Sequence, residues 1–587
     1  MFTRFFTRRE WFLLALGAAL IICQVYMDIA IPDYMSKITD AFLLEAQDKV
    51  MQYGVEMIAA AFLSLIFSLL VGYVLAVLAA STGKNMRLAQ FDRVQSYAME
   101  DINRFSAASL ITRSTNDITQ IQNFIARGLQ MAIKSPILAV WALSRMYGSS
   151  FVYSGAIAWT EVTIAGLLIV FVVMLTSIGI SMPLFKKIQW LTDGVNRSIR
   201  ENLDGIRVIR AYNAEPYQEG KFDKANEDLL NNNLGTVKYM AYAFPVAQSV
   251  MNFVTLAIYW IGAGIIMSLD VVDTQKLAYS DMIVFTSYAM LVLNSCLGFI
   301  GIFRMLPRAM VGMKRIEEVV DTEPSIVDGT VTDGEEGIKG AIEFRNVSFT
   351  YPGTERKILE DISFKVEPGK TFAIIGSTGS GKTTLVNLMA RFYDTTSGDV
   401  YVDGVNVRDF SIKALHLKLG YVPQQAIIFS GSVEMNVNFG HGSESRTEED
   451  VKRALRIAQA EDFVTHMPDG MDSHISQHGR NISGGQKQRV SIARAVCREP
   501  EIYILDDTFS ALDFKTDKAL RESLRKETSG STVVIVAQRI GTIMDADEII
   551  VLDEGRIVGK GKHRELLKTC PIYFDIARSQ LTEEELQ

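Results

Sequence analysis

A glycine-rich segment carries the clearest chemical signal in this chain of 587 residues. Residues Gly376–Thr383 match the phosphate-loop pattern GxxxxGK(S/T) in full. The glycines let backbone N–H groups surround phosphate oxygens, Lys382 can reach the outer phosphates, and the Thr383 hydroxyl can meet Mg²⁺. The apolar run Phe372–Ile375 before it and the helical run Thr384–Met389 after it supply the context that this motif needs. The segment therefore predicts binding of a nucleoside triphosphate together with magnesium.

Two segments further along the chain have residue types that could act on the same phosphates. Asp506 ends the apolar run Ile502–Leu505, and a carboxylate in that position can hold Mg²⁺ directly or through water. Between the two lies Asn481–Arg489, whose Ser-Gly-Gly is expected to open a helix. Free N–H groups and a serine hydroxyl at a helix start favour binding of a γ-phosphate. The sequence does not decide whose nucleotide this helix end would bind.

These motifs need a rigid scaffold, and the pattern from residue 341 onward predicts one. Short β-rich runs alternate with helical stretches, and Phe372–Ile375, Glu501–Leu505 and Thr532–Val536 have the composition of buried strands. This alternation predicts an α/β domain with a parallel sheet over residues 341–580. Residues 321–340 are rich in Gly, Asp and Glu and are expected to be a linker. Residues 581–587 are expected to form a C-terminal tail.

The first 320 residues have a different composition, which predicts a transmembrane domain. Uncharged runs long enough to cross ~30 Å of hydrocarbon lie at 11–27, 57–83, 162–185, 239–269 and 282–303. A weaker sixth run, 125–148, is interrupted by Lys134 and Arg145. The expected fold class is therefore an all-α transmembrane domain of six helices followed by an α/β P-loop nucleotide-binding domain.

Basic residues predict the orientation of the spans. Arg4, Arg8 and Arg9 precede the first run without an A-x-A-like cleavage site, so they are interpreted as cytoplasmic anchors and not as a signal peptide. The N-terminus, residues 84–127, residues 186–238 and the C-terminus are then expected to face the cytoplasm. The connections near 36–51, 148–154 and 270–281 are expected to be short and outside.

The two inner segments are too long for tight turns. Apolar residues recur at helical spacing in 200–230, which predicts that membrane helices continue into the cytoplasm and that each pair carries a short cross-helix. Asn213–Gly220 breaks the helical pattern and suits such a cross-helix, whereas an ordinary solvated loop is the alternative. Pro32, Pro136 and Pro245 are expected to kink or end helices.

Composition excludes several other classes of protein. Hydrophobic residues make up 48% of the chain, which excludes a disordered protein. The formal net charge of −8 gives no basic field for nucleic acid. Four cysteines, Cys23, Cys296, Cys497 and Cys570, lie far apart without CxxC spacing, so neither a disulfide framework nor a zinc site is expected.

Charged residues near the ends of the spans are candidates for contact with a substrate. Asp28, Arg145 and Glu161 belong to this group, because a charge in lipid costs several kcal/mol. Each could equally face the lipid headgroups. None of them identifies a substrate.

The whole chain resembles a half-transporter of the ABC exporter family with the type IV fold, in which six spans precede one nucleotide-binding domain. Five ordered motifs carry the resemblance: the phosphate loop, Tyr351 in FTYPG, Gln424 in YVPQQ, Ile482–Gln486 as ISGGQ where the family has LSGGQ, and Ser510–Asp513. The stretch 103–117 is similar to the one that follows the first coupling helix. The resemblance implies that Tyr351 stacks on adenine and that ATP lies between one half's phosphate loop and the other half's signature.

The motifs and the resemblance together predict the site residues. Nucleotide-binding residues are Tyr351, Gly376, Ser377, Thr378, Gly379, Ser380, Gly381, Lys382, Thr383, Thr384, Ser483, Gly484, Gly485, Gln486 and Asp513. Metal-binding residues are Thr383, Gln424 and Asp506. The catalytic positions are Asp507, Gln538 and Gln424, and the cofactors are ATP and Mg²⁺.

Two of these positions depart from the family. Asp507 stands where the family has a catalytic glutamate, and Gln538 stands where it has the switch histidine. A side chain one methylene shorter retracts the carboxylate by about 1–1.5 Å, and a misplacement near 1 Å can cost ~10²-fold in rate. Gln538 can still donate a hydrogen bond to a γ-phosphate but has no titrating ring. ATP is therefore expected to bind here and to be hydrolysed slowly.

This pattern resembles the degenerate-site subunit of bacterial heterodimeric multidrug exporters. It implies a homologous partner subunit with a normal glutamate and histidine, whose active site this chain's signature completes. The expected function is export of hydrophobic or amphipathic compounds across a bacterial cell membrane. Alternatives are an ATP-gated regulator or channel-like ABC protein, or a homodimeric lipid or drug exporter. Transport against a gradient would separate the first alternative, and rapid ATP turnover by the chain alone would favour the second.

Overall fold

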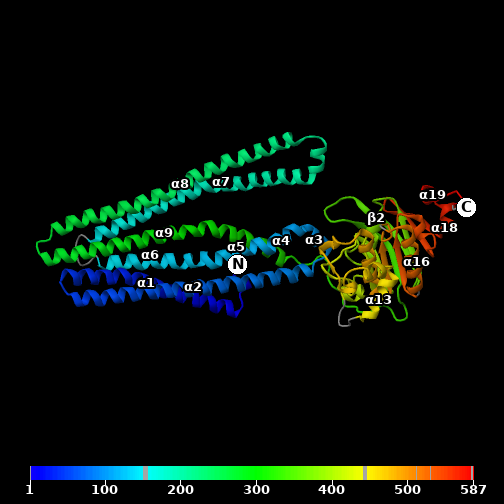
Figure 1. Ribbon diagram of the computed structural model, residues 1–587, viewed down its shortest axis with the longest axis horizontal. Helices are drawn as coiled ribbons and strands as arrows, with labels where there is room; N and C mark the ends of the chain where they lie inside the picture. The colour runs from blue at the N-terminus through cyan, green and yellow to red at the C-terminus, as the bar shows by residue number, and fades with distance from the viewer. Residues whose placement is uncertain are drawn as a thin grey trace. The chain divides into compact units, whose positions relative to one another are not determined.

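The computed structural model describes residues 2–149, 156–440, 446–510, 512–528, 530–583 and 586. The chain divides into two compact units (Figure 1). The first contains Met1–Gln95 and Ala107–Thr322, and the second contains Ser96–Ser106 and Glu323–Gln587. The first unit is built from helices and the second is mainly an α/β domain, so the predicted fold class is confirmed.

Long helices dominate the first unit. They are α1 (Arg8–Leu43), α2 (Gln47–Gln95), α6 (Leu129–Ser149), α7 (Ala156–Ala211), α8 (Glu215–Met267) and α9 (Val272–Asp321). Shorter helical segments are η1 (Phe2–Phe5), α4 (Ala107–Thr112), η2 (Arg113–Asp117), α5 (Ile118–Asn123) and η3 (Phe124–Gly128). Their shared core contains Val25 of α1, Leu75 of α2 and Met313 of α9, all of them inaccessible to solvent.

These helices are much longer than a membrane is thick. Helix α2 has 49 residues and α7 has 56, so their lengths are about 70–85 Å at 1.5 Å per residue. The hydrocarbon core is only ~30 Å thick. The helices are thus long enough to extend well beyond the hydrocarbon, and their extension into the cytoplasm stays a prediction.

Five helical stretches among the described residues are long and apolar enough to cross a membrane. They are Arg8–Leu43, Gln47–Gln95, Ile157–Ser177, Pro245–Met267 and Val272–Gly298. The sixth predicted span lies in α6, which carries Lys134 and Arg145 and is not among these five stretches. Its charges are the reason that the same signal was weak in the sequence.

Two local predictions for the first unit are corrected by the structure. The connection expected at 270–281 is shorter than predicted and lies earlier, because α8 ends at Met267 and α9 begins at Val272. The break expected over Asn213–Gly220 is confined to the turn before α8, which begins at Glu215 with Pro216 in its first turn. Proline suits that position because its missing N–H has no helical partner there. Neither a cross-helix nor a solvated loop therefore joins α7 to α8.

The connection expected at 36–51 is likewise shorter than predicted, because α1 ends at Leu43 and α2 begins at Gln47. Pro32, Pro136 and Pro245 lie inside α1, α6 and α8, so none of them ends a helix. The connection expected at 148–154 lies mostly outside the described residues.

A short helix, α3 (Met99–Phe105), does occupy the first inner connection and groups with the second unit. Asp101 holds its start, because Oδ2 accepts a hydrogen bond from the N–H of Ala98, 3.0 Å away. The same oxygen accepts from the N–H of Ser325, also at 3.0 Å. The side-chain amide of Asn103 donates to the hydroxyl of Tyr393, 3.1 Å away. Helix α3 is thus hydrogen-bonded to two other parts of the second unit, at Ser325 and at Tyr393.

The second unit is built around a six-stranded sheet in the order β12-β11-β3-β10-β9-β6. The strands are β3 (Thr371–Gly376), β6 (Leu419–Val422), β9 (Ile502–Asp506), β10 (Thr532–Val536), β11 (Glu548–Asp553) and β12 (Arg556–Gly561). All neighbours run parallel except β12, which is antiparallel to β11. The predicted parallel core is confirmed, and three of its strands coincide with the runs named above.

An antiparallel sheet, absent from the sequence-based expectation, covers one face of this core. Its order is β2-β1-β4-β5, with β1 (Ile342–Thr350), β2 (Lys357–Val366), β4 (Ser397–Val402) and β5 (Val405–Asn406). Phe364 of β2 stacks on Phe372 of β3 across the two sheets, with ring centroids 5.0 Å apart. Ile504 and Val534 of the central strands join the same cluster.

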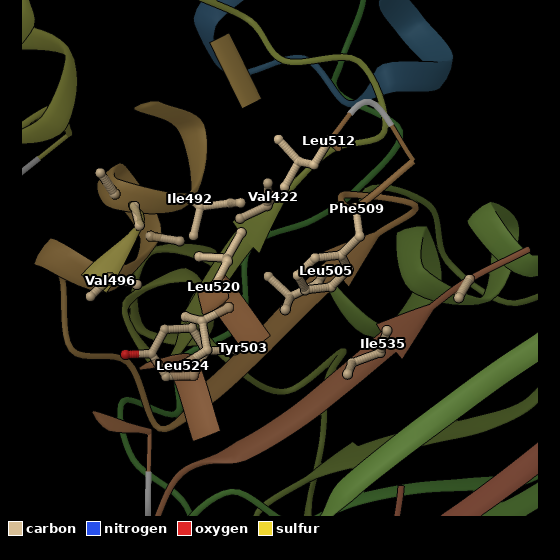
Figure 2. Close-up of a cluster of buried hydrophobic side chains, with 14 of the residues drawn as sticks. Val422, Ile492, Val496, Tyr503, Leu505, Phe509, Leu512, Leu520, Leu524 and Ile535 are labelled. Carbon is tan, nitrogen blue, oxygen red and sulfur yellow. The ribbon is translucent and has the colours of Figure 1, made fainter. Parts of the chain in front are cut away.

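Helices cover the opposite face of the parallel sheet. Figure 2 shows Tyr503 and Leu505 of β9 packed with Leu520 and Leu524 of α16 (Phe514–Glu527) and Ile492 of α15 (Gly484–Cys497). Successive residues of β9 therefore alternate between the two faces, as strand geometry requires.

The remaining elements of the second unit are short. They are α10 (Lys382–Met389), α11 (Ile412–Lys418), α12 (Val433–Val437), α13 (Glu448–Ile457), α14 (Glu461–Thr465), α17 (Ile540–Ile543), α18 (His563–Thr569), α19 (Pro571–Arg578), β7 (Gly431–Ser432), β8 (His474–Ile475), η4 (Gly470–Asp472) and η5 (Gln477–Gly479).

Candidate nucleotide site

The register of three central strands brings the candidate residues to one edge of the sheet. Val536 of β10 pairs with Ile374 of β3 on one side and with Asp506 of β9 on the other. The phosphate loop, Asp507 and Gln538 each follow one of these strand ends within two residues. Open parallel sheets bind ligands at the carboxyl ends of their strands, so this edge is the candidate site.

The backbone of the phosphate loop requires its glycines. Gly379 and Gly381 have φ angles of +84° and +100°, which side-chain-bearing residues rarely adopt. A Cβ at Gly376 would lie 2.0 Å from the carbonyl oxygen of Leu552, so that backbone approach also excludes larger residues. The loop then opens directly into α10, as the motif predicts.

The side chain of Lys382 is hydrogen-bonded to the backbone at the start of the phosphate loop. Its Nζ donates to the carbonyl oxygens of Gly376 and Ser377, at 2.9 and 2.8 Å. Burial lowers the pKa of Lys382, while the charges of Asp507 and Asp506 oppose that shift. The two carbonyl oxygens position the Lys382 ammonium group without neutralising its charge. The group can therefore attract the phosphates of an incoming nucleotide.

Asp506 and Thr383 form a donor set that fits a magnesium ion. The Asp506 side chain is 1% exposed, and its Oδ2 is buried without a hydrogen-bond partner. Burial raises the pKa of Asp506 and the charge of Asp507 adds to the rise, whereas a hydrogen bond from Thr383 lowers it. An orphaned carboxylate oxygen beside a hydroxyl is what a hard cation with oxygen ligands needs. Thr383 and Asp506 would therefore hold Mg²⁺, which when bound neutralises charge on the phosphates.

Two glutamines hold the carboxylate of Asp507. Nε2 of Gln424 and Nε2 of Gln538 donate to the same oxygen, Oδ2, at 3.1 and 3.0 Å. Asp507 itself has a φ of +47°, a conformation that is uncommon for residues other than glycine. Its Oδ2 has two lone pairs and both already have a donor. This arrangement brings all three predicted catalytic positions together.

Tyr351 stands beside the first turn of α10. Its hydroxyl lies 3.1 Å from Oγ1 of Thr384, and its ring is edge-on to those of Phe349 and Tyr393. Since Tyr393 is bonded to Asn103 of α3, an aromatic pair connects this short helix to the phosphate-loop helix. Tyr393 carries no motif and was not predicted from the sequence.

The signature segment is a capped helix start. Ser483 is the N-cap of α15: the N–H of Gln486 donates to its hydroxyl at 3.3 Å. In return, the N–H of Ser483 donates to Oε1 of Gln486 at 2.8 Å. Ile482 packs into the hydrophobic core and is 8% exposed, so isoleucine fills the place of the family's leucine. A Cβ at Gly484 would meet nothing within 4 Å, which leaves the helix start open.

The segment that follows Asp507 has a local structural function. The Ser510 hydroxyl donates to the carbonyl oxygen of Asp507, 2.9 Å away. Asp513 is the N-cap of α16 and accepts a hydrogen bond from the N–H of Thr516 at 3.0 Å. That bond lowers the pKa of Asp513. Ala511 lies outside the described residues.

Charged residues in the first unit pair between α1 and α6. Asp28 forms an ion pair with Lys134 at 2.9 Å, and Asp33 forms one with Arg145 at 3.1 Å. The Tyr288 hydroxyl of α9 also donates to Asp33. Of the three charges singled out in the sequence, Asp28 and Arg145 are thus paired, and Glu161 is exposed on α7.

Two family models match the chain. The ABC transporter transmembrane region matches residues 14–296, and the ABC transporter domain matches residues 359–510. An uncharacterized ABC transporter ATP-binding protein of Mycobacterium tuberculosis is 38% identical over 505 residues, covering 85% of this chain and 84% of its own. The uncharacterized ABC transporter ATP-binding protein YfiB of Bacillus subtilis is 33% identical over 574 residues, covering 97% of each chain.

Two further similarities concern proteins with more descriptive names. An ATP-dependent lipid A-core flippase of Pseudomonas fluorescens is 30% identical over 500 residues, covering 85% of this chain and 80% of its own. The structure of a bacterial Atm1-family ABC exporter with ATP bound superimposes with a TM-score of 0.79 at 22% identity, covering 98% of this chain and 100% of that one. The second similarity concerns the fold alone.

Proposed function

This chain belongs to the ABC transporter family, and we propose that it is the subunit of an ATP-driven exporter that binds ATP firmly and hydrolyses it slowly. The observation that carries this proposal is the pair of amide hydrogen bonds on Oδ2 of Asp507, from Gln424 and Gln538. A site built for efficient hydrolysis would instead leave a longer carboxylate free to orient water.

The proposed slow step follows from what these residues can do with a proton. Gln538 can donate to a phosphate oxygen but cannot take up a proton as a ring nitrogen can. Asp507 must share or give up an amide bond before Oδ2 can accept a proton from water. General-base help contributes ~10²–10⁴-fold in rate, and much of it is lost here. Binding through Lys382, Thr383 and Asp506 is unaffected by either substitution.

The intact signature supports pairing with a homologous chain, and together with Asp507 and Gln538 it makes a heterodimer the proposed form. Ser483 and Gly484 are exposed at a capped helix start, and they would complete a partner subunit's active site. We place a normal glutamate and histidine in that partner. The turn between α7 and α8 adds a second surface for a homologous chain, because Tyr212 and Tyr217 beside it are 79% and 73% exposed.

ATP binding alone can change the conformation of such a complex, provided that ATP binds the closed state more tightly than the open one. Hydrolysis at the partner-dominated site would then reopen it. The proposed cargo is hydrophobic or amphipathic compounds, with multidrug export as the expected activity. The proposed location is a bacterial cell membrane with both termini in the cytoplasm.

A second candidate is a homodimeric lipid exporter. One observation favours it: a relative with 30% identity is named as an ATP-dependent lipid A-core flippase. In that case two copies of this chain would face each other and both sites would contain Asp507.

The two candidates differ in how fast the purified chain hydrolyses ATP alone. We expect the chain in lipid nanodiscs to bind Mg²⁺-ATP and to turn it over slowly. Adding a homologous partner with the normal residues should raise turnover, and replacing the partner's catalytic glutamate with glutamine should abolish it. Asp507→Asn in this chain should leave most of the activity of the mixed complex. Fast turnover by the chain alone would overturn the heterodimer and favour the second candidate.

A further inference from the structure

We infer that Gln580 is a positioning residue for the switch segment, so that the C-terminal end of the chain determines where Gln538 points. This goes beyond the proposed function, which assigns no role to the residues after α19. The inference requires that Gln538 faces the terminal phosphate, and it holds for a heterodimer and a homodimer alike.

The side-chain amide of Gln580 binds the switch segment at two points. Its Oε1 accepts a hydrogen bond from the N–H of Ile540 at 2.8 Å, and its Nε2 donates to the carbonyl oxygen of Gln538 at 2.9 Å. One planar amide thus holds the peptide groups on both sides of Arg539. Because both bonds come from one rigid group, they fix the separation and the direction of these peptides together.

The switch segment also has hydrogen bonds to neighbouring parts of the domain: the N–H of Ala537 donates to the carbonyl oxygen of Ile374 at 3.1 Å, and the Arg539 side chain donates to that of Ser510 at 3.4 Å. The segment runs from the end of β10 at Val536 to α17, which is only four residues long. Arg539, the N-cap of α17, makes no side-chain bond to that helix, and the N–H of Ile540 is one of the first four, which have no partner within a helix. Gln580 supplies that partner from a distant part of the sequence. Ile540 is fully buried, which holds the far end of the segment in the core.

Gln580 is itself held by the fold. It follows α19, and its N–H and that of Leu581 both donate to the carbonyl oxygen of Ala577, at 3.0 and 2.8 Å. Ala577 and Tyr573 of α19 are fully buried in the core of the domain. The side chain of Gln580 therefore extends from an anchored backbone toward the switch segment.

Gln538 connects Gln580 to the nucleotide site. Gln580 fixes the backbone of Gln538, and the side chain of Gln538 donates to Asp507 at 3.0 Å. Releasing the backbone lets Gln538 rotate away from the terminal phosphate. The contacts that Lys382 and the phosphate loop would make with a β-phosphate do not pass through this segment. Gln580 should therefore matter for ATP and not for ADP.

The test compares Mg²⁺-ATP and Mg²⁺-ADP binding to the full-length chain in nanodiscs by calorimetry. Gln580→Leu removes both hydrogen bonds at similar volume, and Gln580→Glu keeps an acceptor for Ile540 while losing the donor to Gln538. Ser579→Ala is the matched control, because its hydroxyl donates only to Ile576 within the same chain end, at 2.7 Å. A neutral hydrogen bond is worth up to about tenfold in an equilibrium constant.

We expect Gln580→Leu to raise the Kd for ATP about 3–10-fold while the Kd for ADP changes less than about twofold. Gln580→Glu should lie between Gln580→Leu and the unmodified chain, and Ser579→Ala should match the unmodified chain. Equal losses for ATP and ADP would mean that Gln580 only stabilises the domain, and that overturns the inference. So does an unchanged Kd for both nucleotides.

Hydrogen exchange gives a readout that does not depend on nucleotide. In Gln580→Leu, the peptide covering residues 537–544 should exchange faster, while β3 and β9 keep their protection. Unchanged exchange in that peptide contradicts the inference even if affinities move. Rapid ATP turnover by the chain alone would contradict the proposed function and leave both of these measurements decisive for Gln580.

Discussion

The side-chain amide of Gln538 donates a hydrogen bond to Oδ2 of Asp507 across 3.0 Å. These are the two catalytic positions predicted to depart from the family, and their side chains are hydrogen-bonded to each other. A histidine opposite a glutamate would place a titrating ring against a longer carboxylate. The two substitutions therefore act as one unit and should be reversed together.

Reversing both should restore hydrolysis. Asp507→Glu with Gln538→His is expected to raise ATP turnover about 10²-fold, because the carboxylate regains its reach and a ring nitrogen returns. Steady-state turnover at saturating Mg²⁺-ATP measures this. Asp507→Asn serves as the control and should not raise turnover. If the double variant remains as slow as the unmodified chain, the cause of slow hydrolysis lies elsewhere.

A charge at the signature should block the partner's site without damaging this domain. Gly484→Asp has room, since a Cβ there meets nothing within 4 Å, and an acid in the first turn stabilises a helix. Its carboxylate would repel the partner's ATP. We expect turnover of the mixed complex to fall at least about tenfold, with this chain's own ATP affinity unchanged. Gly484→Ala, which fills the same space without charge, is the matched control.

The bond between Asn103 and Tyr393 should hold α3 in place. Tyr393→Phe removes the hydroxyl that accepts from Asn103 and leaves the ring against Tyr351. We expect hydrogen exchange in residues 98–105 to rise about 3–10-fold, with ATP affinity retained. Tyr401→Phe in the antiparallel sheet is the control. Unaltered exchange in α3 would show that Asp101 and its two backbone donors are sufficient.

The ion pair between Asp28 and Lys134 should stabilise the first unit. Its side chains are 19% and 28% exposed, and removal of one partner leaves a charge that lacks compensation. Asp28→Asn is expected to cost on the order of 3 kcal/mol. The exchange Asp28→Lys with Lys134→Asp should recover most of that loss. Thermal unfolding of the purified chain in one detergent compares them, and a swap no better than the single variant would contradict pairing as the cause.

A buried lysine should be essential for the second unit. Lys418 lies about 3 Å from Asp403, which is fully buried, and also contacts Glu501 and Asp333. Burial alone would lower the pKa of Lys418, but hydrogen bonds with Glu501, Asp333 and Asp403 raise it overall. Lys418→Met should destabilise the domain by on the order of 3 kcal/mol.

The pH dependence of that loss follows from the direction of the shift. A lysine with a raised pKa contributes its full stability below its ordinary pKa and loses it only at higher pH. The difference in thermal midpoint between Lys418→Met and the unmodified chain should therefore stay constant from about pH 6 to about pH 9. Glu367→Gln on the exposed surface provides the control. A difference that vanishes within this range would contradict the assigned cause.

The sequence predicted the elements whose signal is local. Strands β3, β9 and β10 are buried on both faces, so each is a continuous apolar run. The phosphate loop has its own motif, and Ser483 precedes a recognisable helix start. The long helices were predicted because their apolar runs are long enough to cross a membrane.

Features that depend on distant residues were missed. Strand β1 has a broken pattern of burial, so the antiparallel sheet left no clear period of two. The pairing of Asp28 with Lys134 depends on how two helices are rotated about their axes. Gln580 lies 42 residues from Gln538, and no spacing rule joins them. The roles assigned to the individual site residues stay predictions.

The turn before Glu215 has a mechanical consequence. Helices of 56 and 53 residues meet there with no intervening helix, so the hairpin behaves as a lever without a joint at its tip. Pro183 and Pro245, inside the two helices, are points at which a displacement of the tip can be absorbed as bending. The stiffness of the helices at these two prolines determines how much of a force applied at the turn reaches the other end of the hairpin.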